Sequence, residues 1–174
     1  MTDALTQAPT LTTERLILRG PTRADVAAFT RFVTTNPQMA EQDDLGSERD
    51  AWYAFLAGVG HWHWRGYGFF VLQTHDDPTP LGRVGPILHT GWEAPELAWH
   101  LYEGHTGHGY ATEAATRIRQ WAAQACGLTR LVSYINHANS RSQAVATRLG
   151  AINTTKRADH DADCDVWQHP EVAA

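Results

Sequence analysis

Residues 106–115 read Thr106-Gly107-His108-Gly109-Tyr110-Ala111-Thr112-Glu113-Ala114-Ala115. A glycine-rich turn therefore leads directly into a segment that favours a helix. The first backbone N–H groups of a helix have no partner within it, and the aligned peptide dipoles leave about half a positive charge at that end. A phosphate group is the natural ligand of such a position. The stretch predicts an anion-binding loop at a helix N-terminus.

The residues on both sides of this loop strengthen the prediction. Glu96–Leu101 alternates as a strand does, so the chain order is strand, glycine-rich loop, helix. Glu113 in the first helical turn suits the helix dipole and is spaced to pair with Arg117. Small apolar residues recur at helical spacing along one face, at Ala111, Ala114, Ala115, Ile118, Ala122 and Ala125.

Two well-known phosphate-binding loops share this outline, and neither fits. The Walker type ends in Gly-Lys-Ser or Gly-Lys-Thr, which residues 106–115 do not contain. The Rossmann type needs three spaced glycines, and the third glycine position is not met.

The composition is that of a globular domain. The chain has 174 residues, of which 43% are hydrophobic and 19% charged. This length suits one domain that buries about two thirds of its unfolded surface. The formal charge of -5 argues against a nucleic-acid partner, because such proteins usually present a basic face. A cationic acceptor suits this charge better.

Signals for export, membrane insertion and metal binding are missing from the sequence pattern. Met1–Pro9 has no basic start followed by an apolar core, and no apolar run is long enough to span a bilayer. Cys126 and Cys164 lie far apart and outside any Cys-x-x-Cys pair. The ten histidines form no His-Glu-x-x-His pattern. We expect no membrane partner, no metal and a cytoplasmic location.

Periodicity and capping residues predict the secondary structure. Strands are expected at Arg15–Arg19, Tyr67–Thr74, Leu81–His89, Glu96–Leu101 and Leu128–Asn136, with two short strands near Ile152 and Val166. Helices are expected from a Thr22 cap to about Thr35, from a Ser47 cap to about Trp64, from Tyr110 to about Cys126, and over Asn139–Leu149. The acidic stretch Ala158–Asp163 is expected to be a mobile loop.

The predicted order is β-α-α-β-β-β-α-β-α-β-β, which indicates one mixed sheet with helices around it. The unit from Glu96 to Asn136 implies locally parallel strands joined by a right-handed crossover. A ligand then belongs at the carboxyl ends of these strands, beside the helix start at Tyr110. Periodicity supports an α/β or α+β class, with a single domain over residues 11–170, a flexible segment over 1–10 and a tail over 171–174.

The loop also resembles the Gln/Arg-x-x-Gly-x-Gly/Ala motif of the GNAT N-acetyltransferase superfamily, in which backbone amides hold the pyrophosphate of acetyl-coenzyme A. Gly107–Ala114 looks like the Gly-x-Gly-Tyr-Ala-Thr-Glu-Ala of the branch that includes the RimJ/RimL-type ribosomal-protein N-terminal acetyltransferases. Thr13–Arg19 resembles the opening strand of that branch, and Asn139–Gly150 its late helix. The resemblance implies a GNAT fold, with a mostly antiparallel sheet of about seven strands, about four helices and a splayed parallel strand pair at the cofactor.

The same resemblance implies acetyl-CoA as co-substrate. Loop amides hold its pyrophosphate, the strand around Trp99–Leu101 pairs with pantetheine and offers an oxyanion donor, and Asn139 contacts pantetheine. The implied cofactor-binding residues are Trp99, His100, Leu101, Thr106, Gly107, His108, Gly109, Tyr110, Ala111, Thr112, Asn139 and Ser142.

Two residues depart from the family pattern. Thr106 stands where the motif has Gln or Arg, and Ala146 where many members carry a general-acid tyrosine. The resemblance would allow Arg141 and Arg148 to reach the adenosine 3'-phosphate, although a solvated helix face explains these two residues better.

Acetyl transfer to an amine needs a base, because amines of pKa about 8 to 10 are mostly protonated at neutral pH. Glu96 matches a glutamate that recurs in this branch and is the candidate base, with His100 in reserve on the same strand face. Ser142 is the candidate acid for the leaving thiolate, since Ala146 lacks a hydroxyl. The structural alternatives are an ion pair or solvent exposure for Glu96, and an N-cap at Asn139 with Ser142 as its first-turn partner.

The acceptor side is less constrained by sequence. Trp52, Phe55, Leu56 and Val59 predict a core stripe on the second helix. That helix, its end at His61–Trp64 and the turn at His89–Trp92 are expected to line an acceptor pocket. Protein N-termini, polyamines, aminoglycoside-like antibiotics and other small amines all remain candidate acceptors.

Two functions from different classes follow. The first is an acetyl-CoA-dependent N-acetyltransferase that moves an acetyl group from the thioester to a primary amine by direct attack. The second is a non-catalytic acyl-CoA-binding sensor or interaction domain, which keeps the loop and lacks the base. Oligomeric state stays open, although members of this branch often form homodimers.

Overall fold

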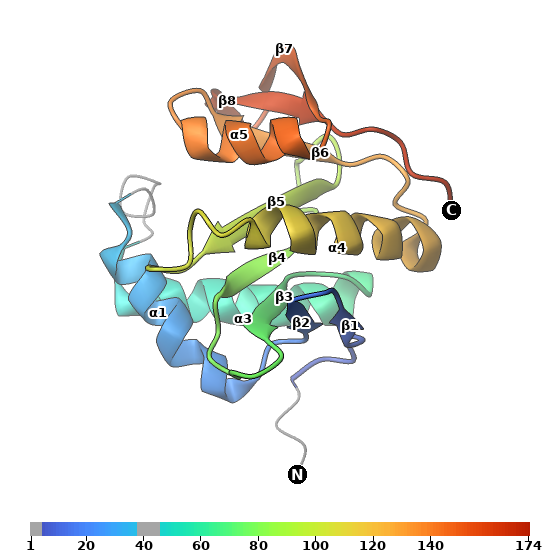
Figure 1. Ribbon diagram of the computed structural model, residues 1–174. Helices are drawn as coiled ribbons and strands as arrows, with labels where there is room; N and C mark the ends of the chain where they lie inside the picture. The colour runs from blue at the N-terminus through green and yellow to red at the C-terminus, as the bar shows by residue number, and fades with distance from the viewer. Residues whose placement is uncertain (1–4, 38–45) are drawn as a thin grey trace.

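The computed structural model describes residues 5–37 and 46–174 (Figure 1). Within these residues one sheet has the strand order β1-β2-β3-β4-β5-β6-β8-β7. Neighbouring strands are antiparallel except for β5 and β6, which are parallel. The strands are β1 (Leu11–Thr12), β2 (Leu16–Arg19), β3 (Phe70–Thr74), β4 (Gly82–Ile87), β5 (Glu96–Leu101), β6 (Val132–Asn136), β7 (Ile152–Ala158) and β8 (Asp161–Gln168).

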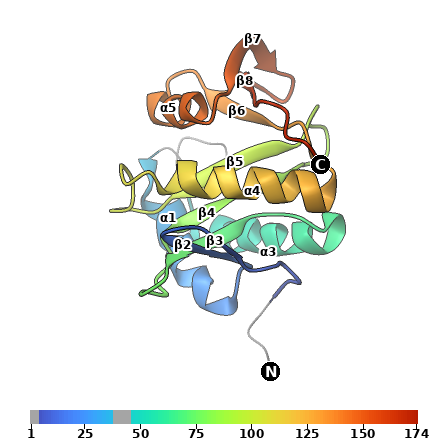
Figure 2. The same cartoon turned by 45° about the vertical axis from the view of Figure 1, so that its right-hand side comes forward.

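Helices cover both faces of this sheet. They are α1 (Val26–Thr35), which follows the 3-10 turn Arg23–Asp25, α3 (Glu48–Arg65), α4 (Tyr110–Cys126) and α5 (Ser140–Arg148). In Figure 1, α4 crosses in front of the sheet and α3 lies behind it. In both cartoon views α5 lies with β6, β7 and β8 at one end of the molecule, while α1 and α3 lie at the other (Figures 1 and 2). The predicted GNAT arrangement of a mostly antiparallel sheet and four helices is confirmed.

Capping residues begin the first two helices as the sequence predicts. The Asp25 carboxylate accepts hydrogen bonds from the Thr22 N–H at 2.7 Å and the Thr22 hydroxyl at 2.9 Å. Ser47 and Asp50 form the equivalent pair at the start of α3. Gly66 ends α3 with φ +76°, the left-handed conformation that favours glycine.

The predicted strands and loops need three corrections. β1 is an additional short strand that pairs with β2, so the described sheet has eight strands. The expectation of a mobile loop over Ala158–Asp163 is wrong, because Ala158 pairs directly with Asp161 in a tight hairpin. β7 and β8 are also longer than predicted. Polar residues occur along both strands because their outer face meets solvent.

The predicted core stripe on α3 is wrong in part. Trp52 and Leu56 are 48% and 43% exposed, whereas Ala51, Phe55 and Trp62 are buried. The buried residues repeat at i, i+4 and i+11, which is also a helical spacing. The stripe that they form lies about 100° around the helix from Trp52. Periodicity allowed both stripes, and contact with α1 selected one of them.

Trp62 belongs to the core rather than to a pocket. Its ring packs edge-on against Phe70 and lies beside Trp121 of α4. Its indole N–H donates to the Phe69 carbonyl at 3.0 Å, which satisfies the polar end of a buried tryptophan. Trp64 is 85% exposed. On α4, Ala123 is buried and Ala125 is exposed, which reverses one position of the predicted face.

The described parts of both terminal segments contact the domain. The Leu5 N–H donates to the Pro21 carbonyl, and Ala8 packs against the main core. Near the other end, the Val172 N–H donates to Thr129 and Glu171 pairs with Arg130. The domain boundaries proposed from sequence remain predictions.

Asp25 is expected to be a strong stability determinant. Its carboxylate is 1% exposed and pairs with Arg19 at 2.8 Å, so Asp25→Ala leaves a cation without its partner. We expect a loss of about 3 kcal/mol in the free energy of unfolding, measured by denaturant titration. Glu171→Ala removes the exposed Arg130 pair and should cost below about 1 kcal/mol. Equal losses in the two variants would contradict this assignment.

Candidate active site

The parallel strands β5 and β6 separate almost as soon as they meet. Their register contains the single pair Glu96 and Val132, after which the strands diverge. A cleft of about 1340 Å³ opens from this point. It is lined by β5, the loop over residues 106–109, the first turns of α4, the end of β6 and the exposed side of α5. The predicted splayed strand pair is therefore confirmed.

Backbone groups of β5 face into this gap. The Pro95 carbonyl accepts from the Val132 N–H, and the Leu97 carbonyl accepts from the Ser133 hydroxyl. Backbone groups of alternate residues in a strand point to the same side, so those of Trp99 and Leu101 also face β6. The β5–β6 register ends before them. Their N–H groups are the candidate oxyanion donors, whereas the backbone of His100 points toward β4.

Buried side chains connect β5 to β6 at the point where the two strands begin to separate. The Ser133 hydroxyl donates to the Leu97 carbonyl at 2.6 Å and contacts His169 Nε2 at 2.9 Å. Since that hydroxyl hydrogen is used by Leu97, His169 Nε2 is the donor in the second contact. Burial lowers the pKa of His169 to about 4, so its ring is neutral. These side-chain hydrogen bonds replace the backbone hydrogen bond that the diverging strands lose.

The glycine-rich loop has the backbone conformation that its residues predict. Gly107 and Gly109 have φ of +85° and +81°, and Gly109 is the N-cap of α4. Thr106 and His108 are exposed, while Tyr110, Ala111 and Thr112 continue into the helix. All residues of 106–112 line the cleft. The Thr112 hydroxyl oxygen is buried and has no hydrogen-bond partner among the described residues, so it is free to contact a ligand.

Arg15 fixes this loop to the helix behind it. Its guanidinium donates to the His108 carbonyl at 3.0 Å and pairs with the Glu113 carboxylate at 2.6 Å. Its charged carbon also lies 4.9 Å from the centre of the Tyr110 ring. Thr13 donates a further hydrogen bond to Glu113. The predicted Glu113–Arg117 pair is therefore wrong, because the bend before β2 brings the better-placed cation Arg15 to the first turn of α4.

Asn139 and Ser142 lie on the opposite wall of the cleft. The Asn139 side chain caps α5 by accepting the Ser142 N–H at 3.1 Å, which confirms the N-cap alternative. The Ser142 hydroxyl accepts the indole N–H of Trp99 at 3.3 Å and keeps its own hydrogen for another acceptor. Ala146 is fully buried beside Ile135 and Ala151, so packing explains the small residue there.

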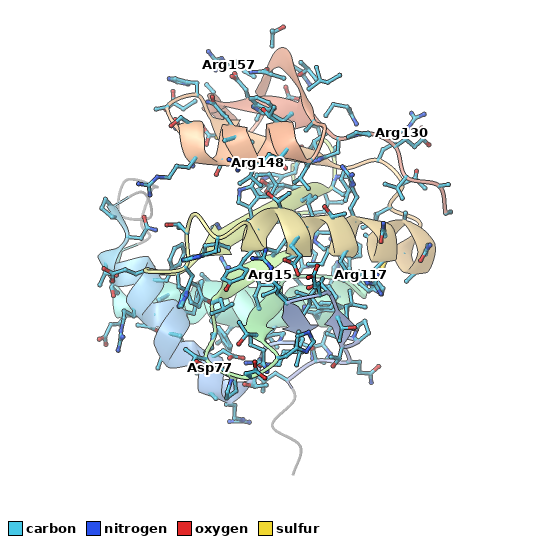
Figure 3. The ribbon with its side chains drawn as sticks, viewed as in Figure 1. Arg15, Asp77, Arg117, Arg130, Arg148 and Arg157 are labelled. Carbon is cyan, nitrogen blue, oxygen red and sulfur yellow. The ribbon has the colours of Figure 1, made fainter. Side chains whose placement is uncertain are left out.

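Two arginines of α5 border the same cleft. Arg141 and Arg148 are exposed and line its rim. Figure 3 places Arg148 between α5 and α4, and Arg15 beside α4. This geometry is compatible with an anionic group at the rim.

Glu96 lies at the closed end of the splay. It is 9% exposed and accepts the Tyr134 N–H at 3.3 Å. It forms no ion pair with any described residue, so neither the ion-pair nor the solvent-exposed alternative holds. Burial raises its pKa from 4.5 to about 8, which is close to that of an amine. This value suits an exchange of protons near neutral pH.

His100 has a different environment from the one expected of a base. Its Nδ1 accepts the Nε–H of Arg83 at 3.0 Å, and its ring packs against Phe32 and Phe69. Burial and the nearby Arg83 charge hold its pKa well below the ordinary value. His100 lines the cleft on the same face of β5 as Glu96.

Sequence reasoning missed four residues of this region: Arg15, Arg83, Ser133 and His169. Each of these residues contacts a partner that is far away in the sequence, so no local spacing of residues predicts its role. Ser133 and Arg83 do interrupt apolar runs at positions where the strand is buried, which is the one signal that was present.

Other classes of site find no support within the described residues. No group of three or more His, Cys, Asp or Glu side chains there is placed to hold a metal ion. None of the helices in the described part of the chain has the length and apolar character needed to cross a bilayer.

Comparison with known proteins places this arrangement in a family. The profile of the family described as "Acetyltransferase (GNAT) domain" matches residues 15–152. The chain belongs to the GNAT acetyltransferases. This GNAT protein is similar in structure to an acetyltransferase from Agrobacterium tumefaciens, with 32% identity and a TM-score of 0.84, over 98% of this chain and 99% of that one. Enzymes of this family acetylate their acceptors from acetyl-CoA.

Two further structures share the fold at lower identity. A GNAT-family acetyltransferase from Bacillus anthracis has 18% identity and a TM-score of 0.73, over 92% of this chain and 96% of that one. Mycobacterium smegmatis RimJ in complex with a CoA disulfide has 19% identity and a TM-score of 0.66, over 88% and 80%. These two likenesses concern the fold.

Glu96 is expected to make stability depend on pH. The unfolded carboxyl loses its proton near its ordinary pKa of 4.5, whereas the folded one keeps it to about 8. The contribution of Glu96 to the free energy of unfolding is therefore fully present below pH 4.5 and is lost as the pH rises to about 8. Glu96→Gln mimics the protonated form and should remove this slope, on the order of a few kcal/mol. Melting temperatures measured from about pH 5 to about pH 8 that fall in parallel for both proteins would contradict the assignment.

Proposed function

We propose that this GNAT protein transfers the acetyl group of acetyl-CoA to a primary amine by direct attack, with Glu96 as the base. The observation that carries the proposal is a buried carboxyl that has no ion-pair partner among the described residues. It lies at the closed end of the cleft, on the same strand as the unpaired backbone donors of Trp99 and Leu101. The acceptor is a protein N-terminus or a small-molecule amine.

The residues of the cleft suit acetyl-CoA. The loop amides of residues 107–111 and the Thr112 hydroxyl offer donors for the pyrophosphate. The backbone of Trp99 and Leu101 offers an unpaired strand edge for the amide groups of pantetheine. Asn139 lies on the opposite wall, although its side-chain oxygen is already used by the Ser142 N–H. Its amide nitrogen remains the group available for pantetheine.

Glu96 supplies the proton acceptor. With a pKa of about 8, its carboxylate form grows across the range in which an α-amine also loses its proton. It takes a proton from the ammonium, directly or through one water, and frees the nitrogen lone pair. The nitrogen then attacks the thioester carbon while an N–H of Trp99 or Leu101 stabilises the charge on the oxygen.

Ser142 is placed to manage the leaving group. Its hydroxyl accepts from Trp99 and has its own hydrogen available. When the carbon–sulfur bond breaks, the attacking nitrogen gives up its remaining extra proton to water, and that hydroxyl donates a hydrogen bond to the thiolate. Thiols ionise near pH 8.5, so a full proton transfer is not required and Ser142 contributes less than Glu96.

The alternative function is an acyl-CoA sensor without catalysis. Thr106 and Ala146, which depart from the family pattern, favour it. The two functions differ in one measurement, because a sensor binds acetyl-CoA without releasing free thiol when amines are added. Thiol release with a panel of amines therefore separates them.

Gly109→Val should weaken cofactor binding. A β-branched residue disfavours φ of +81° and disturbs the loop amides, with a cost of about 1–3 kcal/mol. We expect about tenfold weaker binding of coenzyme A in calorimetry. Gly127→Val is the matched control, because Gly127 has φ +68° at the other end of the same helix. Equal coenzyme A affinity in the two variants would overturn the loop assignment.

Glu96→Gln should slow the reaction and leave cofactor affinity nearly unchanged. Loss of a general base typically costs about a hundredfold or more in kcat. In the parent protein kcat should rise with pH toward a plateau above about pH 8, and the variant should lose that rise. Glu103→Gln, at an exposed position after β5, serves as control. A variant with full turnover and an unchanged pH profile would remove Glu96 from the mechanism.

A further inference from the structure

Arg83 and His100 form a pair that the acetyl-transfer mechanism does not use. They are register partners on β4 and β5, on the sheet face covered by α1 and α3. The guanidinium carbon of Arg83 lies 4.2 Å from the ring centres of both Phe29 and Phe69. No carboxylate among the described residues pairs with it. Arg83 therefore places a positive charge in apolar surroundings.

This pair fixes the tautomer of the imidazole. A guanidinium stays protonated and its Nε can only donate, so His100 Nδ1 must be the acceptor of the 3.0 Å hydrogen bond. The ring proton is then on Nε2. Burial and the Arg83 charge keep the pKa of His100 well below neutrality, so the ring stays uncharged. His100 is thereby excluded as the reserve base, because neither nitrogen has a free lone pair.

The position of His100 indicates which substrate it meets. It lines the cleft together with Phe32 and Asn36 of the α1 segment. Its side chain shares the α1 and α3 face of β5 with Glu96, and the small Ala98 lies between them. Trp99 points to the opposite face, where it meets Ser142. If the cofactor occupies the Trp99 side as proposed above, His100 belongs to the acceptor side.

We propose that His100, held by Arg83 with its proton on Nε2, selects amines that carry a second group with a hydrogen-bond-accepting oxygen and rejects amines that carry a second ammonium. This inference rests on the proposed function and deepens it. A carbonyl or carboxylate oxygen accepts the Nε2–H. An ammonium only donates, so it leaves that N–H unpaired and also meets the positive field of Arg83.

The other charged groups on this face do not cancel that field. Asp25 is neutralised by its ion pair with Arg19. Burial raises the pKa of Tyr102 to about 12 and that of Glu96 to about 8, so both are neutral at pH 7. Among the described residues, Arg83 is the uncompensated charge beside His100.

A matched set of substrates tests the inference. The set consists of linear primary amines of equal chain length whose far ends carry a carboxamide, a carboxylate, a methyl group or a second ammonium. We expect kcat/KM to be about tenfold or more higher for the carboxamide and carboxylate than for the diamine, with the methyl compound between. A diamine that is used as well as the carboxamide would overturn the inference.

Two variants assign the selectivity to this pair. His100→Phe keeps an aromatic ring between Phe32 and Phe69 but removes the donor, and should bring the carboxamide and methyl compounds to similar kcat/KM. His100→Gln keeps both a donor and an acceptor for Arg83 and should restore part of the preference. His75→Phe, at an exposed position outside the cleft, is the control. Selectivity that survives His100→Phe intact would contradict the role of His100.

Nitrogen-15 NMR of histidine-labelled protein reads the tautomer independently of activity. In the parent protein the His100 signals, assigned through His100→Gln, should show the Nε2–H form at neutral pH. Arg83→Met should allow the other tautomer or raise the ring's protonation. An Nδ1–H tautomer in the parent protein would refute the inference even if His100→Phe fails to fold.

The outcomes for the two levels of proposal are distinct. If neither the amines of the set nor a panel of peptide N-termini and other small amines is acetylated, the proposed function fails and the tautomer measurement still stands. If amines are acetylated without preference for an oxygen-bearing far end, the proposed function survives and the selection by His100 fails.

Discussion

The site depends on one constraint, which is that β5 and β6 begin as hydrogen-bonded partners and then part. Backbone groups inside a protein need partners, and a strand that loses its neighbour exposes a row of unpaired donors and acceptors. Here that row belongs to Trp99 and Leu101, at the edge of a cleft rather than at the outside of the sheet. Ser133 and His169 hold the opening in place, because their buried hydrogen bonds replace the first missing backbone bond.

Side chains alternate along β5, so neighbouring residues of this strand face opposite sides of the sheet. Trp99 points toward α5 and the Ser142 hydroxyl, and Glu96 and His100 point toward the opposite face. In the mechanism that we propose, one strand thus serves two substrates, with its backbone edge and one face for the cofactor and its other face for the acceptor. A shift of register by one residue would exchange the two faces and destroy this arrangement.

Electrostatic properties on the acceptor face come from burial rather than from ion pairs. Burial raises the pKa of Glu96, which has no counterion among the described residues, and burial together with the nearby Arg83 charge lowers the pKa of His100. Each group would behave differently if a salt bridge compensated it. The face therefore holds a carboxyl whose pKa is close to that of an amine and, beside it, a neutral imidazole whose Nδ1 is held by Arg83.

Local sequence was sufficient for the elements and for the loop. Gly107 and Gly109 need left-handed backbone conformations, Asp25 and Ser47 complete caps, and Glu96–Leu101 alternates, so short-range rules predicted the strand, the loop and the helix start. Similar reasoning failed for α3. Ala51 and Trp52 each begin a stripe at helical spacing, and only contact with α1 decides which stripe is buried. It also failed for Glu113, because Arg15 reaches it from a bend that is far away in the chain.

The sequence by itself determined the phosphate-type loop, the order of strands and helices, and the candidate base at Glu96. Tertiary structure decided the protonation of that base, the tautomer of His100 and the width of the cleft. These three properties depend on which distant groups surround an atom and how much water reaches it. Chain packing determines the surrounding groups and the access of water, whereas the spacing of residues along the sequence does not.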